Sequence, residues 1–185
     1  MRPIASGLWI ALWVAACAGL TPGTSPSVDA TGILLVQVGE TVQAKPPSEA
    51  VAIALSVAME LADANGNDLG YPWIDPSSAE LVLSAATQRG HELLLSAGIA
   101  VPHRIREVAH GVAELRRIQD EATFLSAQGV PDAKLLFQTI PDQRDNRALL
   151  VIQAMSRPLL DYLARHYPVD AIAVEVNPAG PNGGT

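Results

Sequence analysis

Four histidines are the first side chains to consider for chemistry, because imidazole binds metal ions and exchanges a proton near neutral pH. They are His91, His103, His110 and His166. If residues 103–110 were helical, His103, Glu107 and His110 would share a face at a spacing used in di-metal helical bundles. Such bundles need that element twice, and it occurs once. Residues 104–110 are also more typical of a strand, so we predict surface histidines and no metal site.

Motifs for other kinds of catalysis are missing from the sequence. It has no Gly-x-Ser-x-Gly elbow, no phosphate-binding loop and no glycine fingerprint for dinucleotides. The run from Asp63 to Asp68 has its glycine in the wrong place for a calcium loop, and Ile74 stands where the loop needs glutamate. Asp142 and Asp145 fall in a predicted hairpin loop, where carboxylates are usually solvated. We therefore predict no enzymatic activity and no cofactor.

Tyr71 and Trp73 are the side chains best suited to contact a ligand. The two aromatic residues flank Pro72 and could form a flat binding platform. Aromatic residues make up only 4% of the chain, and such a pair more often completes a core that is otherwise aliphatic. Both interpretations remain open from the sequence.

Cys17 is the only cysteine, and it follows an apolar run from Ile4 to Ala16. The run has the length of a signal-peptide core and is shorter than the roughly 20 residues of a membrane-spanning helix. Val14-Ala15-Ala16-Cys17 resembles a bacterial lipobox, in which the cysteine is lipidated and becomes the first residue of the mature protein. Ala16-Cys17-Ala18 also fits ordinary signal-peptidase cleavage near Ala18, which would remove the cysteine.

The leader and the residues after it predict an exported protein. Residues 1–18 form the signal peptide with its lipobox, and the Gly-, Ser- and Pro-rich residues 19–32 are expected to form a flexible tether. We expect a lipid on Cys17 to anchor the chain to the cell membrane, facing away from the cytoplasm. Secretion after cleavage near Ala18 is the alternative.

Composition predicts one folded domain over residues 33–177, followed by a disordered tail over residues 178–185. Hydrophobic residues are 49% of the chain and charged residues 17%, which argues against general disorder. The formal net charge is −7 and no long basic run occurs, so nucleic acid is an unsuitable partner.

Hydrophobic periodicity predicts alternating helices and strands. The clearest helix covers residues 112–127, where Leu115 and Ile118 lie in the middle of an apolar stripe. We expect further helices at residues 50–64, 89–96 and 158–167, the first and last capped by Ser48 and Ser156. Strands are expected at residues 33–38, 71–75, 80–87, 104–110, 134–140, 147–153 and 170–176.

This order of elements predicts a two-layer α+β fold, with helices on one face of a mixed or antiparallel sheet. From residue 104 onward the order is β-α-β-β-α-β, the order of ferredoxin-like folds. In that arrangement the helices at residues 112–127 and 158–167 would lie side by side, so we expect Leu115 and Ile118 to share a core with Leu160 and Leu163.

Several segments also resemble a known family. Three pairs of segments carry the resemblance: Tyr71-Pro-Trp-Ile-Asp75 with Glu80-Leu-Val-Leu83, Arg106-Glu-Val108 with Ala113 to Asp120, and Asp142 to Asn146 with Ala148 to Ile152. They are similar to segments in the pro-regions of secreted bacterial chymotrypsin-like serine proteases. The resemblance covers roughly residues 71–176. It implies an α+β module that chaperones or inhibits a protease, here without a protease domain before Thr185.

The expected function is therefore binding or interaction without catalysis, by a membrane-tethered lipoprotein. The alternative is a free-standing chaperone or inhibitor, similar to a protease pro-region, that acts on a separate chain. The expected partners are the membrane, through the lipid on Cys17, and an exported protein such as a protease.

Overall fold

The structure, a computed structural model, describes residues 27–36 and 45–180 of the 185-residue chain. Within these residues the chain forms four α-helices and two β-sheets, one with five strands and one with three. The α+β class predicted from the sequence is confirmed. Cys17 and the rest of the leader lie outside the described residues, so lipidation stays a prediction.

The first half of the described chain forms an α-β-β-α-β unit, which we call the N-terminal unit. Its elements are α1 (Glu49–Ala64), β3 (Leu69–Ile74), β4 (Leu81–Ala85), α2 (Gln88–Ser96) and β5 (His103–Glu107). The central strand β4 is antiparallel to β3, as the predicted hairpin requires, and parallel to β5. Buried residues of α1 and α2 share one core with alternate residues of β4, so both helices cover the same face of this sheet.

The second half forms the C-terminal unit, which carries two additional short strands from the N-terminus. Its elements are α3 (Val112–Thr123), the 3₁₀ turn η1 (Ala133–Leu135), β6 (Leu136–Asp142), β7 (Arg147–Ile152), α4 (Arg157–His166) and β8 (Ile172–Val176). Strand β7 is antiparallel to β6 and parallel to β8. Strands β1 (Ser27–Val28) and β2 (Leu34–Val36) extend the sheet beyond β8, so its order is β1-β2-β8-β7-β6.

The two units repeat one topology. Each has a helix, an antiparallel strand pair, a second helix and a final strand that is parallel to the middle one. Five residue pairs join the parallel strands in each unit, from Leu81 and His103 onward in one and from Ala148 and Ile172 onward in the other. The chain therefore contains an internal structural repeat, which the sequence patterns had not indicated.

The predicted ferredoxin-like arrangement is not confirmed. The elements β5, α3, β6, β7, α4 and β8 do follow one another along the chain. However, β5 pairs with β4 in the three-stranded sheet, and β6, β7 and β8 belong to the five-stranded sheet. The order of elements cannot tell which strands share a sheet, because that choice depends on contacts between distant residues.

Side-chain caps fix the start of three helices. Ser48 accepts a hydrogen bond from the backbone N–H of Val51 at 3.3 Å, and Ser156 accepts one from Leu159 at 3.3 Å. These two caps were predicted from the sequence. Thr87 caps α2 in the same way, through the N–H of Gly90 at 3.1 Å. Each cap satisfies one of the N–H groups that a helix start leaves without an internal partner.

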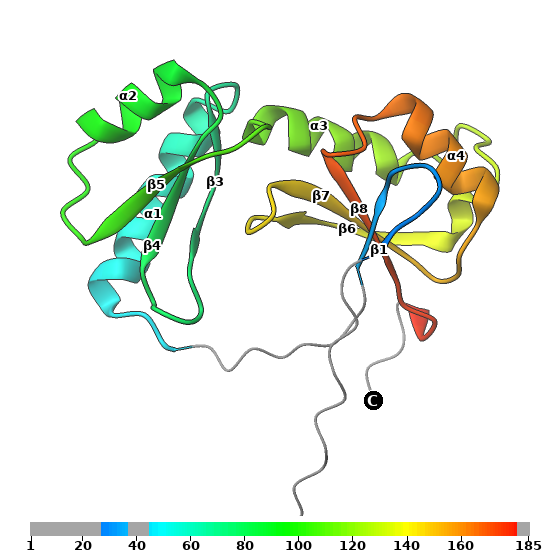
Figure 1. The fold of residues 1–185 in the computed structure, drawn as a ribbon, viewed down its shortest axis with the longest axis horizontal. Helices are drawn as coiled ribbons and strands as arrows, with labels where there is room; N and C mark the ends of the chain where they lie inside the picture. Colours follow the sequence, from blue (N-terminus) through cyan, green and yellow to red (C-terminus); the bar gives the residue numbers. More distant parts are fainter. Residues whose placement is uncertain (1–26, 37–44, 181–185) are drawn as a thin grey trace, which may run out of the picture.

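The apolar stripe of α3 lies in the core, as predicted. Leu115 and Ile118 are fully buried, and they belong to one hydrophobic cluster with Leu160 and Leu163 of α4. Helix α3 packs mainly on β6 and β7 and also contacts β3 and α1 of the N-terminal unit. It therefore extends from the middle of the molecule over the five-stranded sheet (Figure 1).

Specific hydrogen bonds hold the two units and the segment between them in place. The side-chain amide of Asn146, at the end of the β6–β7 loop, accepts a hydrogen bond from His110 N–H at 2.8 Å and donates one to the His110 carbonyl at 2.9 Å. The carbonyl of Gly66, after α1, accepts a bond from Ala113 N–H at 2.9 Å. A Cβ on Gly111 would collide with that same carbonyl, so the approach depends on glycine.

Two findings concern the chain's relation to a membrane. None of the helices in the described residues is long and apolar enough to cross a bilayer. Residues 27 and 28, which we assigned to the tether, pair with Leu35 and Leu34 as strand β1. A tether would therefore lead into the sheet at residue 27.

Candidate functional site

The two aromatic residues of β3 point to opposite faces of the sheet. Between Gly70 and Trp73 the strand advances by three residues while β4 advances by two, from Ser84 to Val82. This bulge breaks the alternation of side chains, because one extra residue shifts the following ones to the other face. Tyr71 therefore joins the helix-covered core and is 5% exposed, whereas Trp73 lies on the other face and is 8% exposed.

Trp73 is covered by two arginines of β5. The guanidinium carbons of Arg104 and Arg106 lie 5.8 and 6.0 Å from the centre of its ring, which is cation–π geometry. Arg106 also donates hydrogen bonds to the carbonyls of Arg144 and Gln143 in the β6–β7 loop. Burial lowers the pKa of Arg106. Tyr71 and Trp73 thus contribute to the core and to the junction between the units, and they form no shared exposed platform.

The histidines lie in separate places. His103 and His166 each have Nδ1 2.8 Å from a carbonyl oxygen, that of Val101 and that of Tyr162 respectively. His110 is buried, with Nδ1 3.0 Å from a Glu114 oxygen and Nε2 3.4 Å from an Asp170 oxygen. Over residues 27–36 and 45–180, no three His, Cys, Asp or Glu side chains are grouped so that they could hold a metal ion.

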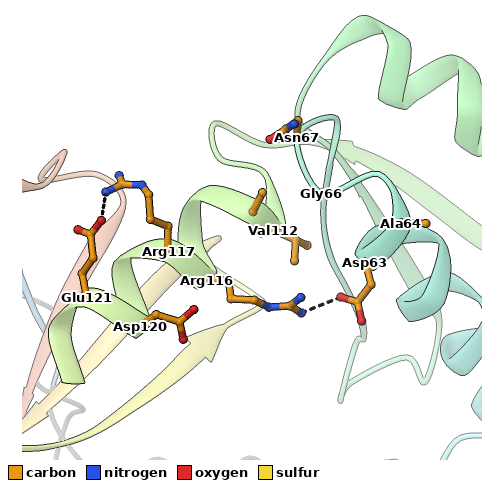
Figure 2. Close-up of a pocket in the computed structure, with 10 residues that line it drawn as sticks. Asp63, Ala64, Gly66, Asn67, Val112, Arg116, Arg117, Asp120 and Glu121 are labelled. Atoms are coloured by element: carbon orange, nitrogen blue, oxygen red, sulfur yellow. Dashed lines mark hydrogen bonds and ion pairs between the residues drawn. The ribbon is translucent and has the colours of Figure 1, made fainter. Parts of the chain in front are cut away.

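A polar hollow of about 540 Å³ lies between the end of α1 and the first turns of α3 (Figure 2). Arg116 extends across it to Asp63 of α1, with 2.7 Å between nitrogen and oxygen. Arg117 instead pairs with Glu121 along α3, at 2.8 Å. Both arginines that line the hollow are thus engaged by carboxylates of the chain itself, which leaves them poorly placed to bind an external anion.

The Asp63–Arg116 pair is better explained as a link between the two units. Asp63 belongs to α1 and Arg116 to α3, and both side chains are about half exposed. An ion pair in that setting is worth roughly 0–1 kcal/mol because water screens it. This pair (Figure 2) and the Gly66–Ala113 hydrogen bond both join the end of α1 to α3.

A second hollow, of about 360 Å³, has a different character. We call it the α1 groove. Its lining residues are all apolar: Ala50, Ile53, Ala54, Val57, Ala97, Gly98, Ile99, Ala100 and Val101. Helix α1 forms one wall, and the segment between α2 and β5 forms the other. The groove is lined by no charged side chain and its surface is mainly apolar, which suits it to an apolar ligand.

Large side chains of α1 are exposed at this groove. Ile53 is 59% exposed and Val57 52% exposed, although both would be stabilised by burial. They are four positions apart in the chain, so they lie on the same side of the helix. Val51, Ala58 and Ala62 of α1 are buried against the N-terminal sheet. Helix α1 is therefore apolar both on its buried face and on part of its exposed face.

The sequence itself carries a signal for this groove. A surface helix normally alternates an apolar stripe with a polar face. From Ala50 to Met59 the only polar residue is Ser56. A helix that is apolar on all sides needs a partner on each side, so this stretch predicts a second contact surface on the helix.

No known protein family matches this chain, and no curated protein shows significant similarity to it. The geometry of the described residues is therefore the basis for the function. Of the hollows described here, the α1 groove is the one suited to bind another molecule, because its surface is apolar and unpaired.

Proposed function

We propose that the chain is an exported, non-catalytic binding protein that is held at the cell membrane by a lipid on Cys17. The α1 groove is its binding surface. The exposure of Ile53 and Val57 beside an apolar hollow is the observation that carries this proposal. Clustered apolar surface of this kind is a recurrent mark of interaction sites in soluble domains.

The polar side chains support binding rather than catalysis. Arg116 and Arg117 are paired with carboxylates, and His110 lies between Glu114 and Asp170. The Arg116 pair links α1 to α3, and the Arg117 pair lies within α3. An acid–base mechanism instead needs a polar group directed at a substrate position.

The anchoring part is tested by the intact mass of the protein extracted from membranes. Wild-type protein is expected to start at Cys17 and to carry the added mass of lipid, and Cys17→Ala to lack that mass and leave the membrane fraction. A mature chain that starts at Gly19 with no added mass would contradict lipidation and leave ordinary secretion.

The binding part is tested with Nile red, an uncharged dye whose fluorescence rises in apolar surroundings. The double variant Ile53→Gln, Val57→Gln should lose most of the fluorescence increase. Phe124→Gln is the control, because Phe124 is 62% exposed but lies at the C-cap of α3, outside the groove. Equal loss in both variants would show that the dye reports general surface apolarity and not the groove.

A further inference from the structure

Resting on the proposed function, we infer that the partner of the α1 groove is an amphipathic helix of another exported protein, apolar on one face and basic at both ends. The apolar face would enter the groove, and the basic ends would reach the carboxylates of Glu49 and Glu60. The inference comes from the position of these two acidic residues on α1.

Glu49 and Glu60 are placed at the two ends of the exposed apolar part of α1. Glu49 precedes Ile53 by four residues and Glu60 follows Val57 by three, so all four side chains lie along one side of the helix. Both glutamates are exposed. They are eleven residues apart, which at about 1.5 Å per residue is about 16 Å along the helix.

These two carboxylates have no ion-pair partner within residues 27–36 and 45–180. Other acidic residues of the helices, such as Asp63, Glu114 and Glu121, do contact a basic side chain. Glu49 and Glu60 therefore offer uncompensated negative charge at both ends of an uncharged groove. That pattern is complementary to a ligand with positive charge at both ends.

The same charges disfavour two other occupants. An anionic bilayer surface attracts basic segments, whereas the two charged residues that bracket this groove are acidic. A second copy of the chain would bring like charges together, and the net charge of −7 adds to that repulsion. A basic helix gains from both the local carboxylates and the overall charge.

Length also favours a helical partner. A helix of about three to four turns spans the distance between Glu49 and Glu60 and is close to the mean length of helices in globular proteins. Its apolar side chains, three and four residues apart, would follow the line of Ile53 and Val57. Because both ends carry the same charge, either direction of the bound helix satisfies the two carboxylates.

The test measures the affinity of the full mature chain for three synthetic peptides with one shared leucine face. The peptides carry lysine, glutamine or glutamate at both ends, eleven positions apart. We expect the lysine peptide to bind best. The double variant Glu49→Gln, Glu60→Gln should weaken it roughly three- to tenfold, because each exposed ion pair contributes little. The glutamine peptide should bind both proteins equally.

A matched control separates local from general charge. Asp120→Asn with Asp145→Asn removes the same two charges from exposed positions of the C-terminal unit and should change the affinity by less than twofold. Thermal melts of each variant are needed too, because Glu49 in the first turn of α1 also favours the helix dipole.

The possible results distinguish this inference from the proposed function. If all three peptides bind alike and Ile53→Gln abolishes binding, the groove binds apolar ligands but the charge inference is wrong. If no peptide binds and vesicles of phosphatidylglycerol do, or if the chain self-associates through Ile53, the helical partner is wrong. If nothing binds and Ile53→Gln leaves the Nile red signal unchanged, both the inference and the proposed function are wrong.

Discussion

One extra residue in strand β3 decides which faces of the sheet its two aromatic side chains occupy. The bulge in β3 directs Tyr71 into the core and Trp73 to the opposite face. Without the extra residue both rings would lie on one face, as the spacing of two residues suggests. Arg104 and Arg106 then cover Trp73 because they follow the strict alternation of β5.

Ile118 should be among the residues on which stability depends most. It is fully buried in the cluster that joins α3 to α4, so Ile118→Ala loses its transfer free energy and leaves a cavity. We expect a loss of about 2–5 kcal/mol in the free energy of unfolding from urea melts. Arg116→Ala, two residues away and paired only at the surface, should cost less than about 1 kcal/mol. Similar losses at both positions would contradict the orientation of α3.

Asp142 should make folding less favourable as the pH rises. Its pKa is raised above its ordinary value of 3.8, mainly because burial disfavours the charged form. The folded state therefore binds the Asp142 proton more tightly than the unfolded state does. The contribution of Asp142 to the free energy of unfolding is present below pH 3.8 and is lost as the pH rises through the raised pKa of the folded state. Asp142→Asn keeps an acceptor for the Asp145 N–H and should raise the urea midpoint at pH 7.

Urea melts at acid pH test whether the pKa of Asp142 is raised in the folded state. The difference between Asp142→Asn and wild type should shrink as the pH is lowered to about 4 and below, because the wild-type carboxyl becomes neutral. Gln138→Asn, which changes no ionisable group at an exposed position of β6, should show no such trend. A variant that is less stable than wild type at pH 7 would show that the charged form of Asp142 is favoured in the fold.

The helices differ in what they cover. Helix α3 is amphipathic in the ordinary way, with one buried stripe and a charged outer face. Helix α1 is apolar on both sides and is the one we expect to gain a partner. Helix α2 is short and lies so close to the turn after α1 that it needs a glycine in its first turns.

Gly90→Ala should destabilise the protein although alanine favours helix. In an ordinary helix this change gains about 1 kcal/mol. Here the new Cβ would collide with the backbone carbonyl of Asp68 and also crowd Leu69. Backbone cannot move aside as a flexible side chain can, so we expect a net loss of about 1–3 kcal/mol by urea melts. Leu95→Ala, an exposed control on the same helix, should change stability by less than about 0.5 kcal/mol. A gain in stability for Gly90→Ala would mean that α2 lies farther from residue 68.

The whole molecule consists of two units of one topology, connected by the short segment between β5 and α3. A pair of such units could move independently if only that segment held them. Gly66 and Arg106 instead form hydrogen bonds to the opposite unit, and Asn146 holds the connecting segment through His110. The junction therefore combines hydrogen bonds to backbone groups with the packing of α3 on α1 and β3.

Asn146 should be the residue on which this junction depends most. It makes two buried hydrogen bonds to His110 and has a left-handed backbone with φ of 54°. Asn146→Gly keeps that backbone but leaves the His110 groups without a partner, so we expect a loss of about 2–4 kcal/mol by urea melts. Asn146→Ala should lose roughly 1 kcal/mol more, because a Cβ disfavours the left-handed region. Wild-type stability in Asn146→Gly would show that the units are held by other contacts.

The sequence by itself determined the class of fold and most of its elements. Apolar periodicity located α3, α4 and their buried residues, and Ser48 and Ser156 identified two helix starts, because these signals depend on neighbours within a few positions. Strands β3 to β8 also lie where alternation and turn residues predicted them, within a few residues at their ends.

Only the tertiary structure decided which strands share a sheet, and therefore that the chain is a repeat of two units. Strand pairing joins residues far apart in the chain, and β5 could by pattern have joined either sheet. The α1 groove was hidden for the same reason, since exposure of Ile53 depends on what the rest of the chain leaves uncovered. Local sequence sets which face of a helix is apolar, and long-range packing sets which apolar face stays free for a partner.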